Sequence, residues 1–263
     1  MRAIAFLLAV LAAGPVMACG PESDCVVAGD RTYRLYLPES DGPMGAILHA
    51  HGYRGAAAGS IRNAGLRGVA DRLGMAFVAL DAGADDWNLA HRPREPGQSE
   101  AREYDYVRAV IADLGDRIDL DTDRLIATGF SAGGMMTWTL ACGMGDVFAG
   151  FVPYAGTFWA PVPETCPAAP APVIHIHGDE DPTVPLAGRP IGPTRQGDVA
   201  VAIEIYGAHG GFGAAQPVPF PHGTGCTVRT GPPGELALCL FQGGHSYDAR
   251  RVEWAIERIL APS

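Results

Sequence analysis

The segment Gly129-Phe130-Ser131-Ala132-Gly133-Gly134 places a glycine-flanked serine at a predicted strand–helix junction. The apolar run 125–127 before it predicts a strand, and residues 135–141 after it predict a helix. A serine on so tight a turn leaves no room for bulk two residues before or after it, and glycine removes that bulk. The turn then presents the Ser131 hydroxyl at the end of the sheet. The alternative is a glycine-rich turn with an incidental serine, so the motif needs support from elsewhere in the chain.

Apolar runs that predict strands alternate with segments of helical periodicity. Strands are predicted at 33–37, 46–50, 75–80, 125–128, 151–154, 173–176 and 236–241, and helices at 60–73, 104–118, 135–141 and 249–260. Residues 198–208 fit both periods, and Asp198 as an N-cap favours a helix there. Residues 210–225 are rich in glycine and proline and predict irregular structure. The alternation predicts an α/β fold, with a mostly parallel, doubly wound sheet flanked by helices.

The start of the chain predicts a secretory signal peptide over residues 1–18. Met1-Arg2 is followed by an apolar run to Ala13 and by small residues at Val16 and Ala18. The run is shorter than the about 20 apolar residues that span a bilayer. Residues 19–263 are then expected to form a single domain that is secreted or periplasmic. Because cleavage after Ala18 would expose Cys19, a lipoprotein anchored through Cys19 is the alternative.

The cysteine content and the net charge narrow the class of protein further. The cysteines of the mature part are Cys19, Cys25, Cys142, Cys166, Cys226 and Cys239. An even set in an exported chain predicts disulfides, and sequence proximity suggests that neighbours pair in that order. No spacing typical of zinc ligands accompanies them, so no metal or cofactor is expected. The net charge of −10 argues against nucleic acid and anionic membrane surfaces as partners.

A catalytic serine needs a base, and the base needs an orienting acid. In the α/β-hydrolase fold these follow the serine in the order acid, then histidine. Asp181 follows the predicted strand 173–176, and His245 follows the last predicted strand on a glycine-rich loop. Both match that order, so Ser131, Asp181 and His245 are predicted as a catalytic triad. Asp181 as a simple turn residue is the alternative. His175 and His177 alternate along a strand and are expected to be structural.

An acyl-transfer site also needs hydrogen-bond donors for the oxyanion. The backbone N–H of Ala132, directly after the serine, is one predicted donor, and the N–H of Tyr53, in the loop after an early strand, is the other. Trp87, Phe158 and Trp159 are predicted to line an apolar substrate pocket. The alternative for these three aromatic residues is an ordinary place in the core or on the surface.

Several motifs together resemble those of one known family. They are His51-Gly52-Tyr53, Asp86-Trp87-Asn88, the Ser131 segment, His177-Gly178 with Asp181 and Val184-Pro185, and Gly243-Gly244-His245. The mature chain resembles the extracellular polyhydroxybutyrate depolymerase and feruloyl esterase-like branch of the α/β-hydrolases. The resemblance implies a secreted serine esterase acting on hydroxyalkanoate or hydroxycinnamate esters, with the triad and oxyanion hole named above. Residues 191–221 depart from the pattern of that family.

The expected function is therefore hydrolysis of a small-molecule or oligomeric carboxylic ester through an acyl-enzyme. A peptidase or an acyltransferase with the same triad is an alternative, because one fold supports several chemistries. A binding protein on an inactive hydrolase scaffold is a further alternative, but it would have lost a triad residue, and all three residue types are present.

Overall fold

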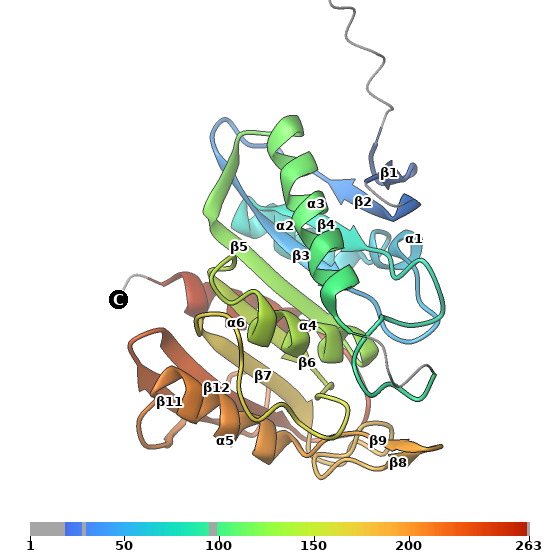
Figure 1. Cartoon of the computed structure of the whole chain (residues 1–263). Coiled ribbons are helices and arrows are strands. Elements are labelled where there is room, and N and C mark those ends of the chain that lie inside the picture. Colours follow the sequence, from blue (N-terminus) through green and yellow to red (C-terminus); the bar gives the residue numbers. More distant parts are fainter. Residues whose placement is uncertain (1–18, 28–29, 95–98, 262–263) are drawn as a thin grey trace, which may run out of the picture.

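The computed structural model describes residues 19–27, 30–94 and 99–261 (Figure 1). The predicted signal peptide lies outside these residues. Within them, one sheet has ten strands. These are β1 (Cys25–Val26), β2 (Thr32–Tyr36), β3 (Met44–Ala50), β4 (Ala76–Leu80), β5 (Leu120–Phe130), β6 (Gly150–Tyr154), β7 (Val173–Gly178), β10 (Gln216–Val218), β11 (Gly225–Gly231) and β12 (Gly234–Phe241).

The strand order is β1-β2-β4-β3-β5-β6-β7-β12-β11-β10. From β4 to β12 each strand is parallel to its neighbour, whereas β2 and β11 pair antiparallel at the two margins. This arrangement confirms the predicted α/β-hydrolase fold with its mostly parallel sheet. It also brings the carboxyl ends of the central strands to one edge, where open α/β sheets place their sites.

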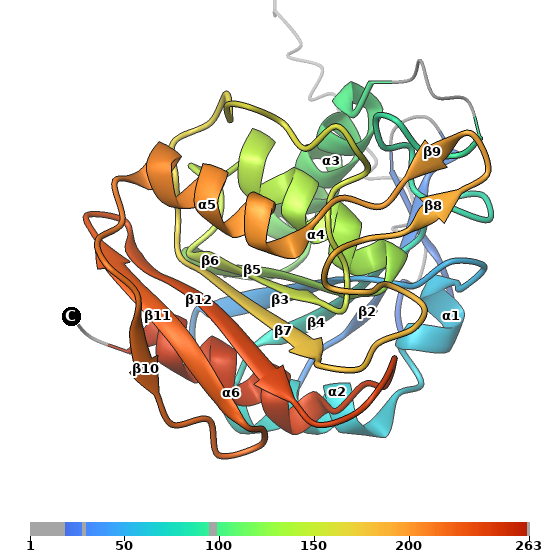
Figure 2. The ribbon, with the colours of Figure 1, turned by 90° about the horizontal axis from the view of Figure 1, so that it is seen from below.

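Helices cover both faces of the sheet, as Figure 2 shows. The helices are α1 (Ala57–Ser60), α2 (Ala64–Leu73), α3 (Ala101–Arg117), α4 (Ala132–Gly143), α5 (Val199–Gly210) and α6 (Ala249–Leu260). α3, α4 and α5 pack on one face, where Val107 and Trp138 belong to a single buried cluster. α1, α2 and α6 pack on the other face, where Leu66 and Val252 belong to a second cluster.

Two helix predictions had different outcomes. Residues 60–73 do not form one helix, because the chain turns between α1 and α2. Asn63 caps α2, accepting a hydrogen bond from Leu66 N at 3.2 Å. The helix predicted after Asp198 is confirmed as α5, and the Asp198 carboxylate accepts from Ala200 N at 2.7 Å.

The prediction of irregular structure for residues 210–225 is wrong in part. β10 lies inside this segment, and β11 begins at its end and pairs with β12. Only alternate side chains of β11 are buried, Cys226 and Val228 among them, so this margin strand lacks the apolar run that marked the central strands. A separate pair of short strands, β8 (Pro190–Ile191) and β9 (Thr194–Arg195), lies before α5.

Three disulfides form with the pairing that proximity suggested. They join Cys19 to Cys25, Cys142 to Cys166 and Cys226 to Cys239. The second fastens the end of α4 to the loop before β7, and the third links directly opposed residues of β11 and β12. No helix among the described residues has the length and apolar character to cross a membrane.

Candidate active site

Ser131 occupies the turn between β5 and α4 in a strained backbone conformation. Its φ of 59° and ψ of −118° are unfavourable for a residue with a side chain. Ser131 N donates to Tyr154 O at 2.9 Å, and Ser131 O accepts from Met135 N at 3.0 Å, which holds the turn. A Cβ on Gly133 would overlap the Ala50 carbonyl, and one on Gly129 would overlap Gly133. The two glycines therefore let β3, β5 and α4 meet at the serine.

Asp181 and His245 are brought together by two neighbouring strands. Asp181 follows β7 and His245 follows β12, and these strands pair in parallel. His245 Nδ1 lies 2.6 Å from Asp181 Oδ2. Because a carboxylate only accepts, Nδ1 carries the proton, and Nε2 of the neutral ring is an acceptor.

The surroundings of Asp181 favour its ionised form. Burial raises the pKa of this carboxyl, but hydrogen bonds from His245 and from the backbone outweigh burial and hold the pKa below its ordinary value. The backbone donors are Val184 N at 2.9 Å and Thr183 N at 2.8 Å, both to Oδ1. Asp181 is thus an anion held in one orientation against His245.

His245 lies beside the turn that carries Ser131. Its ring packs on Phe130 with 4.6 Å between ring centroids. Ser131 Oγ makes no hydrogen bond within the described ranges. Serine–histidine contacts are often long before substrate binds, so the missing bond does not argue against the triad. The triad of Ser131, Asp181 and His245 stays a prediction.

A chain of hydrogen bonds connects α4 to the turn of Asp181. Trp138 Nε1 donates to His175 Nδ1 at 3.0 Å, His175 Nε2 lies 2.8 Å from His177 Nδ1, and His177 Nε2 lies 2.7 Å from Val184 O. The indole can only donate and the carbonyl can only accept, so each ring donates from Nε2. Burial lowers the pKa of both histidines, which keeps them neutral.

The two predicted oxyanion donors lie on either side of the serine turn. Ala132 is the first residue of α4, so its N–H has no intrahelical acceptor. Tyr53 N, in the loop after β3, has no acceptor in the described part of the chain. The loop approaches the serine closely, since a Cβ on Gly52 would lie 3.6 Å from Ser131 Cβ.

His51 holds this loop in shape. Its Nε2 accepts from Ala82 N at 3.1 Å, so its Nδ1 carries the proton and donates to Gly52 O at 2.8 Å. The same residue's carbonyl accepts from Trp87 Nε1 at 2.8 Å. Trp87 is fully buried, and its hydrogen bond is a structural role that the sequence did not reveal.

A pocket of about 320 Å³ opens at Ser131. Trp159 lines it, together with Tyr53, Met135, Val184, Ile191 and Gln196. Trp87 and Phe158 are not among the lining residues of this pocket, since Trp87 packs beneath the loop and Phe158 packs on Trp138 at 5.5 Å between centroids. Their place in a substrate pocket stays a prediction. Ile191 and Gln196 come from the segment that departed from the family pattern.

Asp86 is a pocket residue that sequence analysis missed. It lines the pocket, and burial raises its pKa to about 6, against the opposing effects of the Trp87 N–H and of Arg92 and Arg94. Its place in the Asp86-Trp87-Asn88 motif, in the loop that follows the buried strand β4, was the available signal. The described residues contain no cluster of three or more His, Cys, Asp or Glu side chains that could hold a metal ion.

Residues 90–260 match the sequence model of the dienelactone hydrolase family. The chain belongs to the dienelactone hydrolase family. A Nocardia uniformis subsp. tsuyamanensis protein named "Putative esterase NocK" is 36% identical over 178 residues, which are 65% of this chain and 51% of that protein. The chain thus spans about half the length of this curated relative.

Solved structures show the same fold for this dienelactone hydrolase family member. Acetyl xylan esterase from Aspergillus awamori aligns with a TM-score of 0.67 and 14% identity, over 89% of this chain and 98% of that one. S-Formylglutathione hydrolase from Agrobacterium tumefaciens aligns with a TM-score of 0.57 and 17% identity, over 87% and 90% of the two chains. The closer resemblance to polyhydroxybutyrate depolymerases and feruloyl esterases stays a prediction.

Proposed function

We propose that this dienelactone hydrolase family member is an exported serine esterase that hydrolyses carboxylic esters through an acyl-enzyme. Ser131 is the nucleophile, His245 the general base and Asp181 the orienting acid. The observation that carries the proposal is the 2.6 Å bond between His245 Nδ1 and Asp181 Oδ2 beside a serine on a strained turn. That bond leaves His245 Nε2 as the acceptor that a serine hydroxyl needs.

Acylation begins when His245 Nε2 takes the proton of Ser131 Oγ as the oxygen attacks the ester carbonyl. The backbone N–H groups of Ala132 and Tyr53 donate to the oxyanion that forms, and each such donor contributes about 3 kcal/mol to the transition state. His245 then gives the proton to the departing alkoxide. In deacylation His245 activates a water molecule in the same way, and Ser131 is regenerated.

Asp181 keeps His245 in the tautomer that this cycle requires. The low pKa of its carboxyl supports an anion, which also stabilises the imidazolium that forms in each half-reaction. The hydrogen bonds from Val184 N and Thr183 N hold that carboxylate in place while the charge on His245 changes.

The pocket at Ser131 suits an acyl group of hydroxyalkanoate or hydroxycinnamate type. Its volume of about 320 Å³ is at the small end for ligand sites. Met135, Val184 and Trp159 supply apolar surface, and Asp86 supplies a hydrogen-bond acceptor for a hydroxyl group. Three disulfides support export of residues 19–263 as one secreted or periplasmic domain.

The test is hydrolysis of short aryl esters and hydroxyalkanoate esters by the wild type and by Ser131→Ala. We expect the variant to lose about 10⁵-fold or more in kcat, as much as removal of the base. Ser40→Ala is the matched control, because Ser40 is exposed and far from the site, and it should keep full activity. Equal rates for Ser131→Ala would rule out the serine mechanism, and activity confined to amides would favour the peptidase alternative.

A separate measurement addresses export. Mass spectrometry of the mature N-terminus should find an unmodified chain that begins at Cys19. A diacylated Cys19 would replace the secreted assignment with the lipoprotein alternative and would leave the chemistry unchanged.

A further inference from the structure

A second cavity borders the same two turns that form the pocket at Ser131. It has a volume of about 290 Å³, and His49, Gly52, Gly59, Leu66, Phe130 and Tyr247 are among its lining residues. We call it the His49 cavity. Gly52 directly precedes Tyr53, and Phe130 directly precedes Ser131, so both turns contribute residues to both cavities.

The two cavities extend over opposite faces of the sheet. Leu66, in the His49 cavity, belongs to the buried cluster beneath α1, α2 and α6. Met135 and Trp159, in the pocket at Ser131, belong to the cluster beneath α3, α4 and α5. A substrate whose carbonyl lies at Ser131 therefore has one cavity available on each side of the reacting bond.

The His49 cavity contains a buried histidine whose ring has no hydrogen-bond partner among the described residues. His49 is 5% exposed, and neither of its ring nitrogens has a hydrogen bond within the described ranges. Tyr247 Oη is buried and equally without a partner there. Burial, with a smaller effect of His51, lowers the pKa of His49 to about 3, so the ring is neutral and offers one donor and one acceptor.

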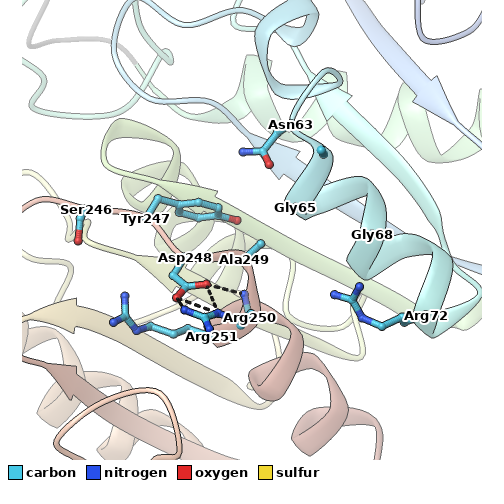
Figure 3. Close-up of a pocket in the computed structure, with 11 residues that line it drawn as sticks. Asn63, Gly65, Gly68, Arg72, Ser246, Tyr247, Asp248, Ala249, Arg250 and Arg251 are labelled. Carbon is cyan, nitrogen blue, oxygen red and sulfur yellow. Dashed lines mark hydrogen bonds and ion pairs between the residues drawn. The ribbon is translucent and has the colours of Figure 1, made fainter.

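Among the described residues, no charged side chain lines the His49 cavity, whereas Asp86, Arg94 and Arg189 line the pocket at Ser131. A neighbouring hollow shares Asn63 and Tyr247 with the His49 cavity and does contain arginines (Figure 3). There Arg250 pairs with Asp248 at 2.7 Å, and Arg72 pairs with Glu253. The hollow of Figure 3 therefore offers no unpaired cation at these two positions, and we assign it no ligand.

The proton transfer in acylation determines on which side of Ser131 the alcohol leaves. When the bond between the carbonyl carbon and the alcohol oxygen breaks, the bond from Ser131 Oγ to that carbon has formed, and the proton taken from Ser131 passes from His245 Nε2 to the leaving oxygen. The alcohol must therefore depart beside His245. The His245 ring packs on Phe130, and Phe130 and Tyr247, 5.4 Å apart between ring centroids, both line the His49 cavity.

We propose that the His49 cavity holds the leaving alcohol of the ester and selects uncharged alcohols that bear a second hydroxyl group. This inference rests on the proposed function. The apolar wall of Leu66 and Phe130 contacts the carbon chain of the alcohol. The His49 ring and Tyr247 Oη make hydrogen bonds to its second hydroxyl. A charged alcohol is disfavoured because nothing in the cavity would compensate its loss of water.

The first test compares butyrate esters that differ only in the alcohol, namely methyl, propyl and glyceryl butyrate. His49→Phe keeps a ring of similar size and removes no hydrogen bond to the protein. We expect kcat/KM for glyceryl butyrate to fall roughly 5- to 10-fold, the effect of one hydrogen bond, while methyl butyrate stays within about 2-fold of the wild type.

The second test narrows the cavity instead of removing its polar groups. Gly59→Leu adds a side chain at a position where a Cβ meets no atom within 4 Å. Propyl and glyceryl butyrate should lose at least about 5-fold in kcat/KM relative to methyl butyrate. Gly115→Leu is the matched control, since Gly115 is also an exposed helical glycine with nothing within 4 Å, far from either cavity.

The outcomes separate this inference from the proposed function. Unchanged alcohol selectivity in both His49→Phe and Gly59→Leu, or an equal loss on all three esters, would overturn the assignment of the cavity. A changed preference among methyl esters of different acids, with the alcohol preference intact, would overturn it as well. If the wild type hydrolyses methyl butyrate and Ser131→Ala does not, the proposed function stands whichever result is found.

Discussion

His245 and the pair His175–His177 lie on neighbouring strands or directly after them, yet their surroundings differ in two respects. The His245 side chain is 16% exposed, and its one hydrogen bond within the described ranges joins Nδ1 to the Asp181 carboxylate. His175 and His177 are fully buried, and both nitrogens of each ring are hydrogen-bonded. The same residue type is thus a candidate base where one ring nitrogen is not used by the fold, and a fixed connector where both nitrogens are.

The comparison explains why histidines so close together would have separate roles. If His175 or His177 gained a proton, two N–H donors would face each other in the series of hydrogen bonds that begins at Trp138 Nε1. A proton added to His245 Nε2 would meet no such conflict, and the adjacent carboxylate would stabilise it. Each prediction below tests one part of this contrast.

Replacing His245 is expected to have the largest effect. His245→Ala removes the proposed base and should lower kcat by about 10⁵-fold or more, because the serine hydroxyl is then not activated. Steady-state ester hydrolysis measures the loss. A decrease smaller than about 10-fold would mean that His245 is not the base, and the contrast with His175 and His177 would fail.

Replacing Asp181 should have the next largest effect. Asp181→Asn keeps the size of the side chain but presents an amide to His245, which favours the wrong tautomer, and kcat should fall by about 10⁴-fold. The fold should persist, as far-ultraviolet circular dichroism can verify. Asp179→Asn is the matched control, since Asp179 lies in the same turn and accepts from Gly243 N rather than from His245. Equal losses in both variants would contradict the assignment of Asp181.

Replacing His177 should have a moderate effect, because His177 positions Asp181 through Val184. His177→Gln keeps a donor for Val184 O but no longer places an acceptor at the position of Nδ1 for His175, so kcat should fall roughly 10- to 100-fold with little change in KM. His209→Gln is the control, because His209 also bonds a backbone carbonyl, that of Ala168, at 2.9 Å. A loss as large as that of His245→Ala would mean that the buried pair takes part in the chemistry.

The smallest effect concerns the stability of the buried histidines in acid. Their pKa values are lowered in the folded state, so below about pH 6.5 the unfolded chain binds protons that the folded chain excludes. The free energy of unfolding then falls as the pH falls, by at most about 1.4 kcal/mol per pH unit for each such group. For His49 this window extends from pH 6.5 down to about 3.

Denaturant unfolding of His49→Phe at pH 6 and pH 5 measures this contribution. The stability lost between the two pH values should be about 1.2 kcal/mol smaller in the variant than in the wild type. An identical loss in both proteins would show that His49 is not buried as a neutral ring in solution.

The features that were predicted correctly from the sequence are those set by neighbouring residues, such as glycine positions and apolar runs. Gly129 and Gly133 predict the serine turn because steric overlap there forbids a Cβ. Asp181 and His245 were predicted because each follows a predicted strand, in the order acid and then histidine. The remaining features depend on contacts between distant segments. Nothing near Trp87 indicates that its indole bonds the His51 carbonyl, and the partners of His175 lie in α4 and β7. Strand β11 escaped prediction because a margin strand buries only alternate side chains.

Labelling with a fluorophosphonate ester, followed by mass spectrometry of the digested protein, tests the proposed mechanism most directly. This reagent forms a covalent bond with an activated serine oxygen and releases fluoride. We expect one adduct per chain, on Ser131, with labelling that becomes undetectable in Ser131→Ala and far slower in His245→Ala. An adduct on another residue, or full ester hydrolysis by protein that carries no adduct, would contradict the assignment of Ser131 as the nucleophile.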